Sequence, residues 1–117
     1  MPMLAGRVAV VTGGARGLGL ATVEAAVAEG AIPVVFDRDA TALDALSATL
    51  TGRGVDHLAL RVDVAEEAQV DAAFADVAVR FGRIDILVNN AGIAIRRPTL
   101  ELSVADWQAV IDVNLTA

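Results

Sequence analysis

The sequence predicts an α/β fold, a doubly wound parallel sheet in which helices alternate with strands. Short apolar runs alternate along the chain with longer segments of helical periodicity, and glycines punctuate their junctions. Hydrophobic residues make up 56% of the chain and aromatic residues only 3%, so the core must consist of Ala, Val, Leu and Ile. This composition is typical of buried parallel strands covered by closely packed helices. At 117 residues, the chain has room for one domain.

The first strand and helix are expected on either side of a glycine-rich turn. Residues 7–12 contain the apolar run VAVV, which predicts a strand buried on both faces. An Ala-rich helix is expected from Gly17 to Glu29, and Gly30 is a suitable stop for it. Its small side chains would allow close packing on the sheet.

The second strand is expected from Ile32 to Asp37, and a helix from Ala40 to Leu50. Glycines at 52 and 54 would end this helix. One face of the helix carries the leucines Leu43, Leu46 and Leu50.

The third strand, His57 to Asp63, differs because its large apolar residues alternate with polar ones, which predicts a half-exposed strand near a sheet edge. An amphipathic helix is expected from Glu66 to Phe81, ending at Gly82. The run from Ile84 to Asn89 predicts a fourth strand. The expected order is therefore β-α-β-α-β-α-β, with right-handed crossovers.

A last helix is expected after Ser103 and Asp106, which form a Ser-x-x-Asp start signal. No Gly, Pro or Lys closes this helix before the sequence stops, and the fourth strand would expose an apolar edge. We therefore expect residues 1–117 to be the N-terminal part of a larger domain. One face of the expected helix carries Trp107, Val110, Ile111 and Asn114.

Charge and composition argue against several function classes. The net charge is −6 and all nine basic residues are arginines scattered along the chain, so neither nucleic acid nor a membrane surface is an expected partner. The absence of cysteine and the single histidine argue against disulfides and a transition-metal site. No apolar run approaches the roughly 20 residues of a spanning helix, and a cytoplasmic protein is expected.

The glycines between the first strand and helix predict a phosphate-binding turn. Gly13, Gly17 and Gly19 form a Gly-x-x-x-Gly-x-Gly pattern, looser than the common Gly-x-Gly-x-x-Gly fingerprint. A turn that only allows helix and strand to pack is the alternative. Asp37 follows Gly19 by 18 residues, close to the spacing at which a carboxylate binds an adenosine ribose. By itself, Asp37 would serve equally well as a helix cap.

Four motifs in order now point to a family. They are TGGARGLG from Thr12, DV at Asp63, NNAG from Asn89 and VNL from Val113. With these motifs, the chain resembles the N-terminal half of a short-chain dehydrogenase/reductase over essentially its whole length. The resemblance implies a Rossmann-type fold and a dinucleotide cofactor.

The resemblance also implies roles for individual residues. Asp37 would bind the adenosine ribose, and Asp63 and Val64 would border the adenine. The turn around the pyrophosphate would consist of Gly13, Ala15, Arg16, Gly17, Leu18 and Gly19. The residues along the second ribose would be Asn90, Ala91 and Gly92, while Asn89 steadies the sheet.

Asn114 resembles the asparagine that helps this family hold a water and a proton relay behind the active site. A frayed helix end with the asparagine in solvent is the alternative. The serine and Tyr-x-x-x-Lys that complete such a site would follow Ala117. The chain contains no lysine or tyrosine, so we expect it to be inactive alone.

Two residues bear on cofactor choice. Asp37 would repel a ribose 2′-phosphate and favours NAD, whereas a basic residue at Arg16 is often used in the family to hold NADP. NAD is therefore the expected cofactor, with NADP as the alternative.

The implied function is hydride transfer between NAD(H) and a small alcohol or ketone, such as a sugar acid or polyol. The alternatives are an NADP-dependent 3-oxoacyl carrier-protein reductase and a non-catalytic nucleotide-binding half-domain. The resemblance also implies a homotetramer for the full-length form.

Overall fold

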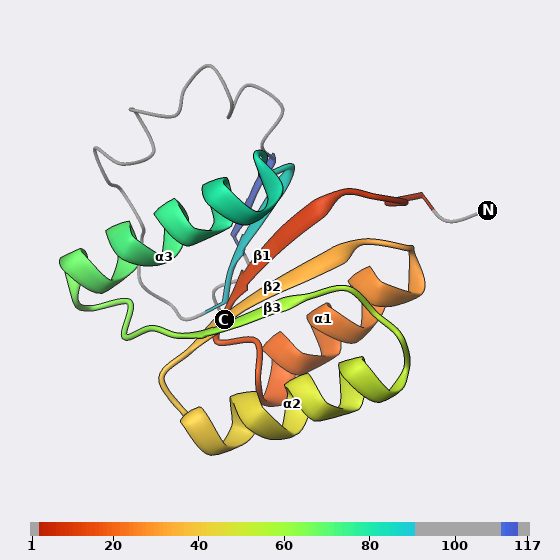
Figure 1. The fold of residues 1–117 in the computed structure, drawn as a ribbon, viewed down its shortest axis with the longest axis horizontal. Helices are drawn as coiled ribbons and strands as arrows, with labels where there is room; N and C mark the ends of the chain where they lie inside the picture. Colours follow the sequence, from red (N-terminus) through yellow and green to blue (C-terminus); the bar gives the residue numbers. More distant parts are fainter. Residues whose placement is uncertain (1–2, 91–110, 115–117) are drawn as a thin grey trace.

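A five-stranded parallel sheet forms the centre of the molecule in the computed structural model, which describes residues 3–90 and 111–114 (Figure 1). The strand order is β3-β2-β1-β4-β5, so β1 lies between two neighbours and β3 at one edge. The strands are β1 (Val8–Thr12), β2 (Ile32–Asp37), β3 (Leu58–Arg61), β4 (Ile86–Asn89) and β5 (Ile111–Asn114).

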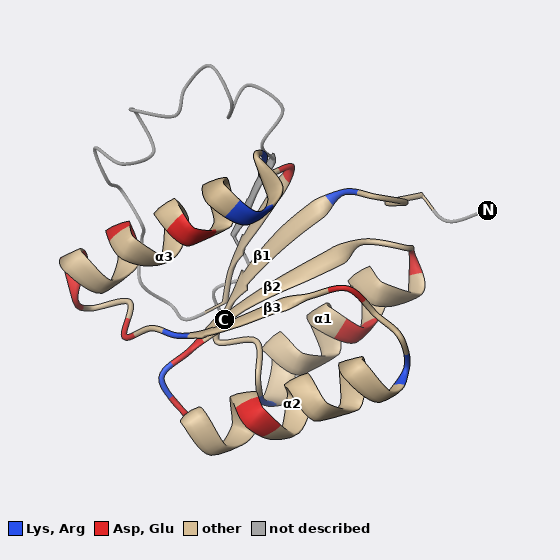
Figure 2. Cartoon of the chain, in the orientation of Figure 1, with Lys and Arg blue, Asp and Glu red and all other residues tan. Residues whose placement is uncertain are grey.

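Helices cover both faces of the sheet. Helices α1 (Gly17–Ala28) and α2 (Ala40–Gly52) lie on one face, and α3 (Glu67–Phe81) lies on the other (Figure 1). Acidic residues occur on all three helices (Figure 2). No helix among the described residues is long and apolar enough to cross a membrane.

The two faces of β1 supply separate cores. Val10 packs in the cluster under α3 together with Phe36 and Phe74, whose rings meet edge to face at 5.3 Å. Val11 points to the other face and packs with Val23 of α1. All five β1 residues are buried, as expected for a central parallel strand.

The four expected strands and the three expected helices between them are confirmed, with ends that differ by one or two residues. The expected edge position of the third strand is also confirmed. Gly82 ends α3 in the left-handed conformation, with φ of 71°.

The expectation of a helix through Ile111 and Asn114 is wrong, because residues 111–114 form strand β5. β5 pairs in parallel with β4, from Ile86 opposite Ile111 to Asn89 opposite Asn114. An edge strand presents unpaired N–H and C=O groups, and the β-branched Ile111 and Val113 suit an extended segment that pairs with them. The start signal at Ser103 and Asp106 lies outside the described residues.

At the amino end of the sheet, Asp85 joins β1 to β4. Its buried carboxylate accepts the Val8 N–H at 2.9 Å and hydrogen bonds from Arg83 and Arg7. Burial alone raises the pKa of Asp85, but the hydrogen bonds from Arg83 and Val8 outweigh it and hold the pKa below its usual range. The charged carboxylate therefore stabilises the fold.

We expect Asp85→Ala to lower the free energy of unfolding by about 2 kcal/mol at pH 7, because the buried Val8 N–H loses its acceptor. The folded pKa is lowered, so this stabilisation is complete above the unfolded value of about 3.9 and is lost as pH falls through the folded pKa. Urea unfolding should show that wild type and Asp85→Ala differ less in the free energy of unfolding at pH 3 than at pH 7. Asp56→Ala, which breaks an exposed ion pair with Arg80, is the control. If Asp56→Ala lowered the free energy of unfolding by as much as Asp85→Ala, the special role of Asp85 would be contradicted.

Candidate functional site

The turn between β1 and α1 depends on three of its glycines. Gly13 and Gly17 have φ of 66° and 55°, the left-handed region that other residues rarely adopt. Gly19 is needed for a different reason. A Cβ at Gly19 would lie 1.9 Å from the Gly13 carbonyl oxygen and 2.7 Å from Asn90 Nδ2. The backbone segments at Gly13 and Gly19 therefore lie too close together to leave room for any side chain at position 19.

The first turn of α1 is not capped by a side chain. Arg16 occupies the N-cap position in an extended conformation and makes no side-chain cap hydrogen bond. In α2, by contrast, the Asp39 side chain accepts the Ala42 N–H at 3.0 Å. The first N–H groups of α1 and the positive end of its dipole thus face the turn without a capping oxygen, an arrangement that suits an anion.

Asp37 ends β2 beside this turn, with its side chain buried. Its Oδ2 accepts the Ala15 N–H at 3.1 Å, and its Oδ1 accepts the Asp39 N–H at 3.0 Å. Each oxygen therefore holds one backbone donor. A carboxylate accepts about four hydrogen bonds, so capacity remains for two more donors, the number that vicinal ribose hydroxyls supply.

A cavity of about 410 Å³ lies between the turn and the ends of β2 and β3. Its volume falls within the usual range of small-ligand sites. The cavity is lined by Gly13, Arg16, Gly17, Phe36, Asp37, Arg38, Val62, Asp63 and Val64.

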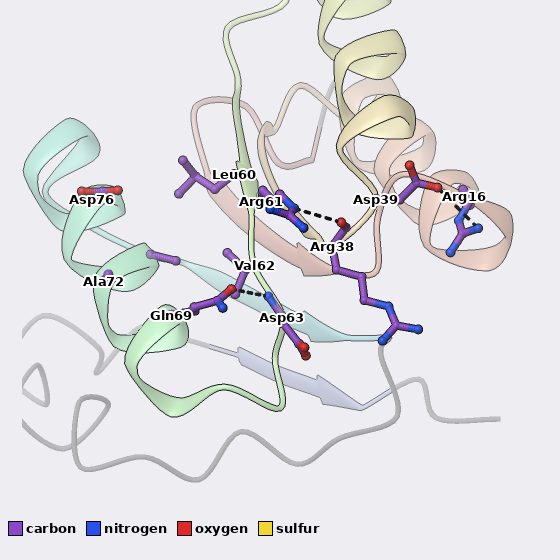
Figure 3. Close-up of a pocket in the computed structure, with 11 residues that line it drawn as sticks. Arg16, Arg38, Asp39, Leu60, Arg61, Val62, Asp63, Gln69, Ala72 and Asp76 are labelled. Carbon is purple, nitrogen blue, oxygen red and sulfur yellow. Dashed lines mark hydrogen bonds and ion pairs between the residues drawn. The ribbon is translucent and has the colours of Figure 1, made fainter.

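A second cavity, of about 630 Å³, shares four lining residues with the first and extends toward α3 (Figure 3). The shared residues are Arg16, Arg38, Val62 and Asp63. We call the first the ribose cavity, after the adenosine ribose that the sequence resemblance implies for Asp37, and the second the outer cavity.

The loop after β3 is held by local hydrogen bonds. The Asp63 N–H donates to Gln69 Oε1 at 2.9 Å, and Asp63 Oδ1 accepts the Ala65 N–H at 3.0 Å. These contacts fix Val64, which lines the ribose cavity and packs against the core under α3. The loop thus supplies an apolar wall suited to a flat ring.

Thr12 joins the ends of β1 and β4. Its hydroxyl donates to Asn89 Oδ1 and accepts the Asn90 N–H, both at 3.0 Å. Asn90 Nδ2 in turn reaches the Gly13 carbonyl at 3.4 Å. The roles of Thr12 and Asn90 in holding the turn were not predicted from the sequence, although Thr12 begins the motif TGGARGLG.

The structure brings most of the predicted site residues to one edge of the sheet, where β1, β2, β3 and β4 end. Ala91 and Gly92 lie outside the described residues. Asn114 was predicted on a helix and instead ends β5 opposite Asn89, which places its backbone at the same edge. The predicted residues that gather at this edge are Gly13, Ala15, Arg16, Gly17, Leu18, Gly19, Asp37, Asp63, Val64 and Asn90.

Comparison with known proteins gives a family match over nearly the whole chain. A family model described as short chain dehydrogenase matches residues 7–117. D-threitol dehydrogenase of Mycolicibacterium smegmatis is 45% identical over 97% of this chain and 44% of its own length. The 3-oxoacyl-[acyl-carrier-protein] reductase of Synechocystis is 43% identical over 99% of this chain and 47% of its own length. The chain therefore spans less than half the length of these relatives.

A solved structure agrees with the fold. The crystal structure of a short chain dehydrogenase/reductase from Burkholderia phymatum, in complex with NAD, superposes with a TM-score of 0.74 and 36% identity. The match covers 80% of this chain and 33% of that protein.

Proposed function

Because this chain belongs to the short-chain dehydrogenase family, we propose that it forms the dinucleotide-binding part of an oxidoreductase that prefers NAD(H). In the proposed reaction, a hydride is transferred between the nicotinamide ring of the cofactor and a small alcohol or ketone. The observation that carries the proposal is Asp37, a buried carboxylate with spare acceptor capacity on the wall of the ribose cavity.

Asp37 is assigned to the adenosine ribose. Its two oxygens already bind the N–H groups of Ala15 and Asp39, which hold the carboxylate in place. A 2′-phosphate would bring negative charge against this carboxylate, whereas a 2′-hydroxyl donates to it. This asymmetry supports NAD over NADP.

The β1–α1 turn is assigned to the pyrophosphate. Gly13 and Gly17 line the ribose cavity without a side chain, and α1 presents N–H groups and a dipole with no side-chain cap. Gly13, Ala15, Arg16, Gly17, Leu18 and Gly19 form this part of the proposed site. The adenine is assigned to Asp63 and Val64, and the second ribose to Asn90, Ala91 and Gly92.

Asn114 is assigned to the group of residues that helps to hold a water and the proton relay behind the active site. The proposal for catalysis depends on residues after Ala117. A serine followed by Tyr-x-x-x-Lys in the coding sequence there would support it. A stop codon directly after Ala117 would restrict this chain to nucleotide binding.

A polyol or sugar acid is the preferred substrate class. The similarity to D-threitol dehydrogenase supports it. The buried Asp37 also supports it, because this carboxylate favours NAD, whereas the rival 3-oxoacyl carrier-protein reductase is NADP-dependent. An NADP-dependent 3-oxoacyl carrier-protein reductase is the second candidate, favoured by the comparable identity to the Synechocystis enzyme and by Arg16, which lines the ribose cavity. A cytoplasmic location and a homotetrameric full-length protein are also proposed from the family.

Separate titrations of the chain with NADH and NADPH, followed by nicotinamide fluorescence, test the cofactor assignment. We expect NADH to bind at least about tenfold more tightly, because a 2′-phosphate would lie against Asp37. Tighter binding of NADPH would contradict the assignment of Asp37. Binding of neither cofactor would contradict the proposed dinucleotide site.

A further inference from the structure

Asp39 is held in place at the start of α2 by two hydrogen bonds, each between a backbone N–H and a carboxylate oxygen. Its Oδ1 accepts the Ala42 N–H at 3.0 Å, which caps the helix. Its own N–H donates to Asp37 Oδ1 at 3.0 Å. The Asp39 carboxylate is thus fixed relative to the carboxylate assigned to the ribose.

The second oxygen of Asp39 pairs with Arg16. Arg16 Nη1 lies 3.5 Å from Asp39 Oδ2, and the ion pair joins the β1–α1 turn to the start of α2 (Figure 3). The Arg16 side chain is 67% exposed and the Asp39 side chain 33% exposed. Since Asp39 is anchored and Arg16 is long and exposed, the arginine adapts to the carboxylate.

Arg16 is well placed to act on a group attached to the ribose. Its side chain lines both the ribose cavity and the outer cavity, as does that of Arg38. An arginine beside the ribose is the usual means of accepting a 2′-phosphate. In this chain, the arginine is already engaged by Asp39.

We propose that Asp39 is a second carboxylate that determines cofactor choice, because it pairs with Arg16 and withholds that guanidinium from a 2′-phosphate. The inference rests on the proposed dinucleotide site and adds a specificity residue to it. Asp37 discriminates at the 2′-hydroxyl itself. Asp39 discriminates by pairing with Arg16, one of the two arginines that line both cavities.

Asp39→Asn tests the proposal, because asparagine is as good a helix cap as aspartate but carries no charge. The probes are adenosine 2′,5′-bisphosphate and AMP, which differ only in the 2′-phosphate, titrated by calorimetry. We expect the affinity for the bisphosphate to rise about fivefold, the upper range for an exposed ion pair, and that for AMP to stay the same.

Two further variants separate the ion pair from a general charge effect. Adding Arg16→Gln to Asp39→Asn should abolish the gain, because no guanidinium is then released. Asp44→Asn removes the same charge from an exposed position on α2 and should leave both affinities unchanged.

The outcomes distinguish this inference from the function on which it rests. AMP binding with no gain for the bisphosphate in Asp39→Asn overturns the role of Asp39 alone. The same gain with Arg16→Gln present overturns the action through Arg16. Failure of the wild-type chain to bind AMP overturns the proposed site and this inference with it.

Discussion

Gly19→Ala is expected to disrupt the β1–α1 turn and abolish detectable NADH binding. The added Cβ would lie 1.9 Å from the Gly13 carbonyl oxygen, an atom of the backbone that cannot rotate away. The turn must shift, at an expected cost of about 1–3 kcal/mol in the free energy of unfolding. Urea unfolding and fluorescence titration with NADH measure the two effects.

Gly52→Ala is the matched control for this substitution. Gly52 lies in the last turn of α2, and a Cβ there meets no atom within 4 Å. Alanine is the better helix former by up to about 1 kcal/mol, so this variant should be at least as stable as wild type and bind NADH normally. If Gly19→Ala behaved like Gly52→Ala, the close approach at Gly19 would not matter for the site.

Asp37→Ala is expected to weaken NADH binding by about tenfold to a hundredfold, the usual cost of losing hydrogen bonds to a charged group. NADPH binding should fall less, because the same change removes the repulsion of the 2′-phosphate. The preference for NADH over NADPH should therefore shrink or reverse. Parallel titrations of the variant with both cofactors give this ratio directly.

Asp76→Ala provides the comparison for Asp37→Ala. Asp76 lines the outer cavity but not the ribose cavity, and it is exposed on α3. The same charge is lost, yet NADH affinity and the cofactor ratio should stay close to those of wild type. A loss of NADH affinity in Asp76→Ala as large as that in Asp37→Ala would mean that the net charge near the cavities, and not Asp37, controls binding.

The sequence was sufficient to predict the elements that depend on local signals. Val8–Thr12 is a continuous apolar run that ends at glycines, and such a run suits a strand buried on both faces. The leucines of α2 repeat at helical spacing, and Gly82 supplies a left-handed stop for α3. Parallel pairing then brings the ends of these strands to one edge, which is why the candidate site could be anticipated.

The features that the sequence did not predict depend on contacts between residues far apart in the sequence, or on competition between a helix and a strand for the same segment. The hydroxyl of Thr12 binds Asn89 across 77 positions, and the Asp85 carboxylate binds the Val8 N–H across the same separation. No local pattern specifies such pairs. At residues 111–114, a helical signal competes with the unpaired edge of β4, and pairing with that edge prevails.

The central claim is that the edge formed by the ends of β1, β2, β3 and β4 binds the dinucleotide. Amide chemical shifts of the ¹⁵N-labelled chain, recorded as NADH is added, test it most directly because they locate binding without requiring catalysis. The account predicts saturable shifts concentrated in residues 13–19, 37–39 and 63–64 and at Asn90. Saturable shifts confined to the outer faces of α1 and α2, or no shifts at all, would contradict it.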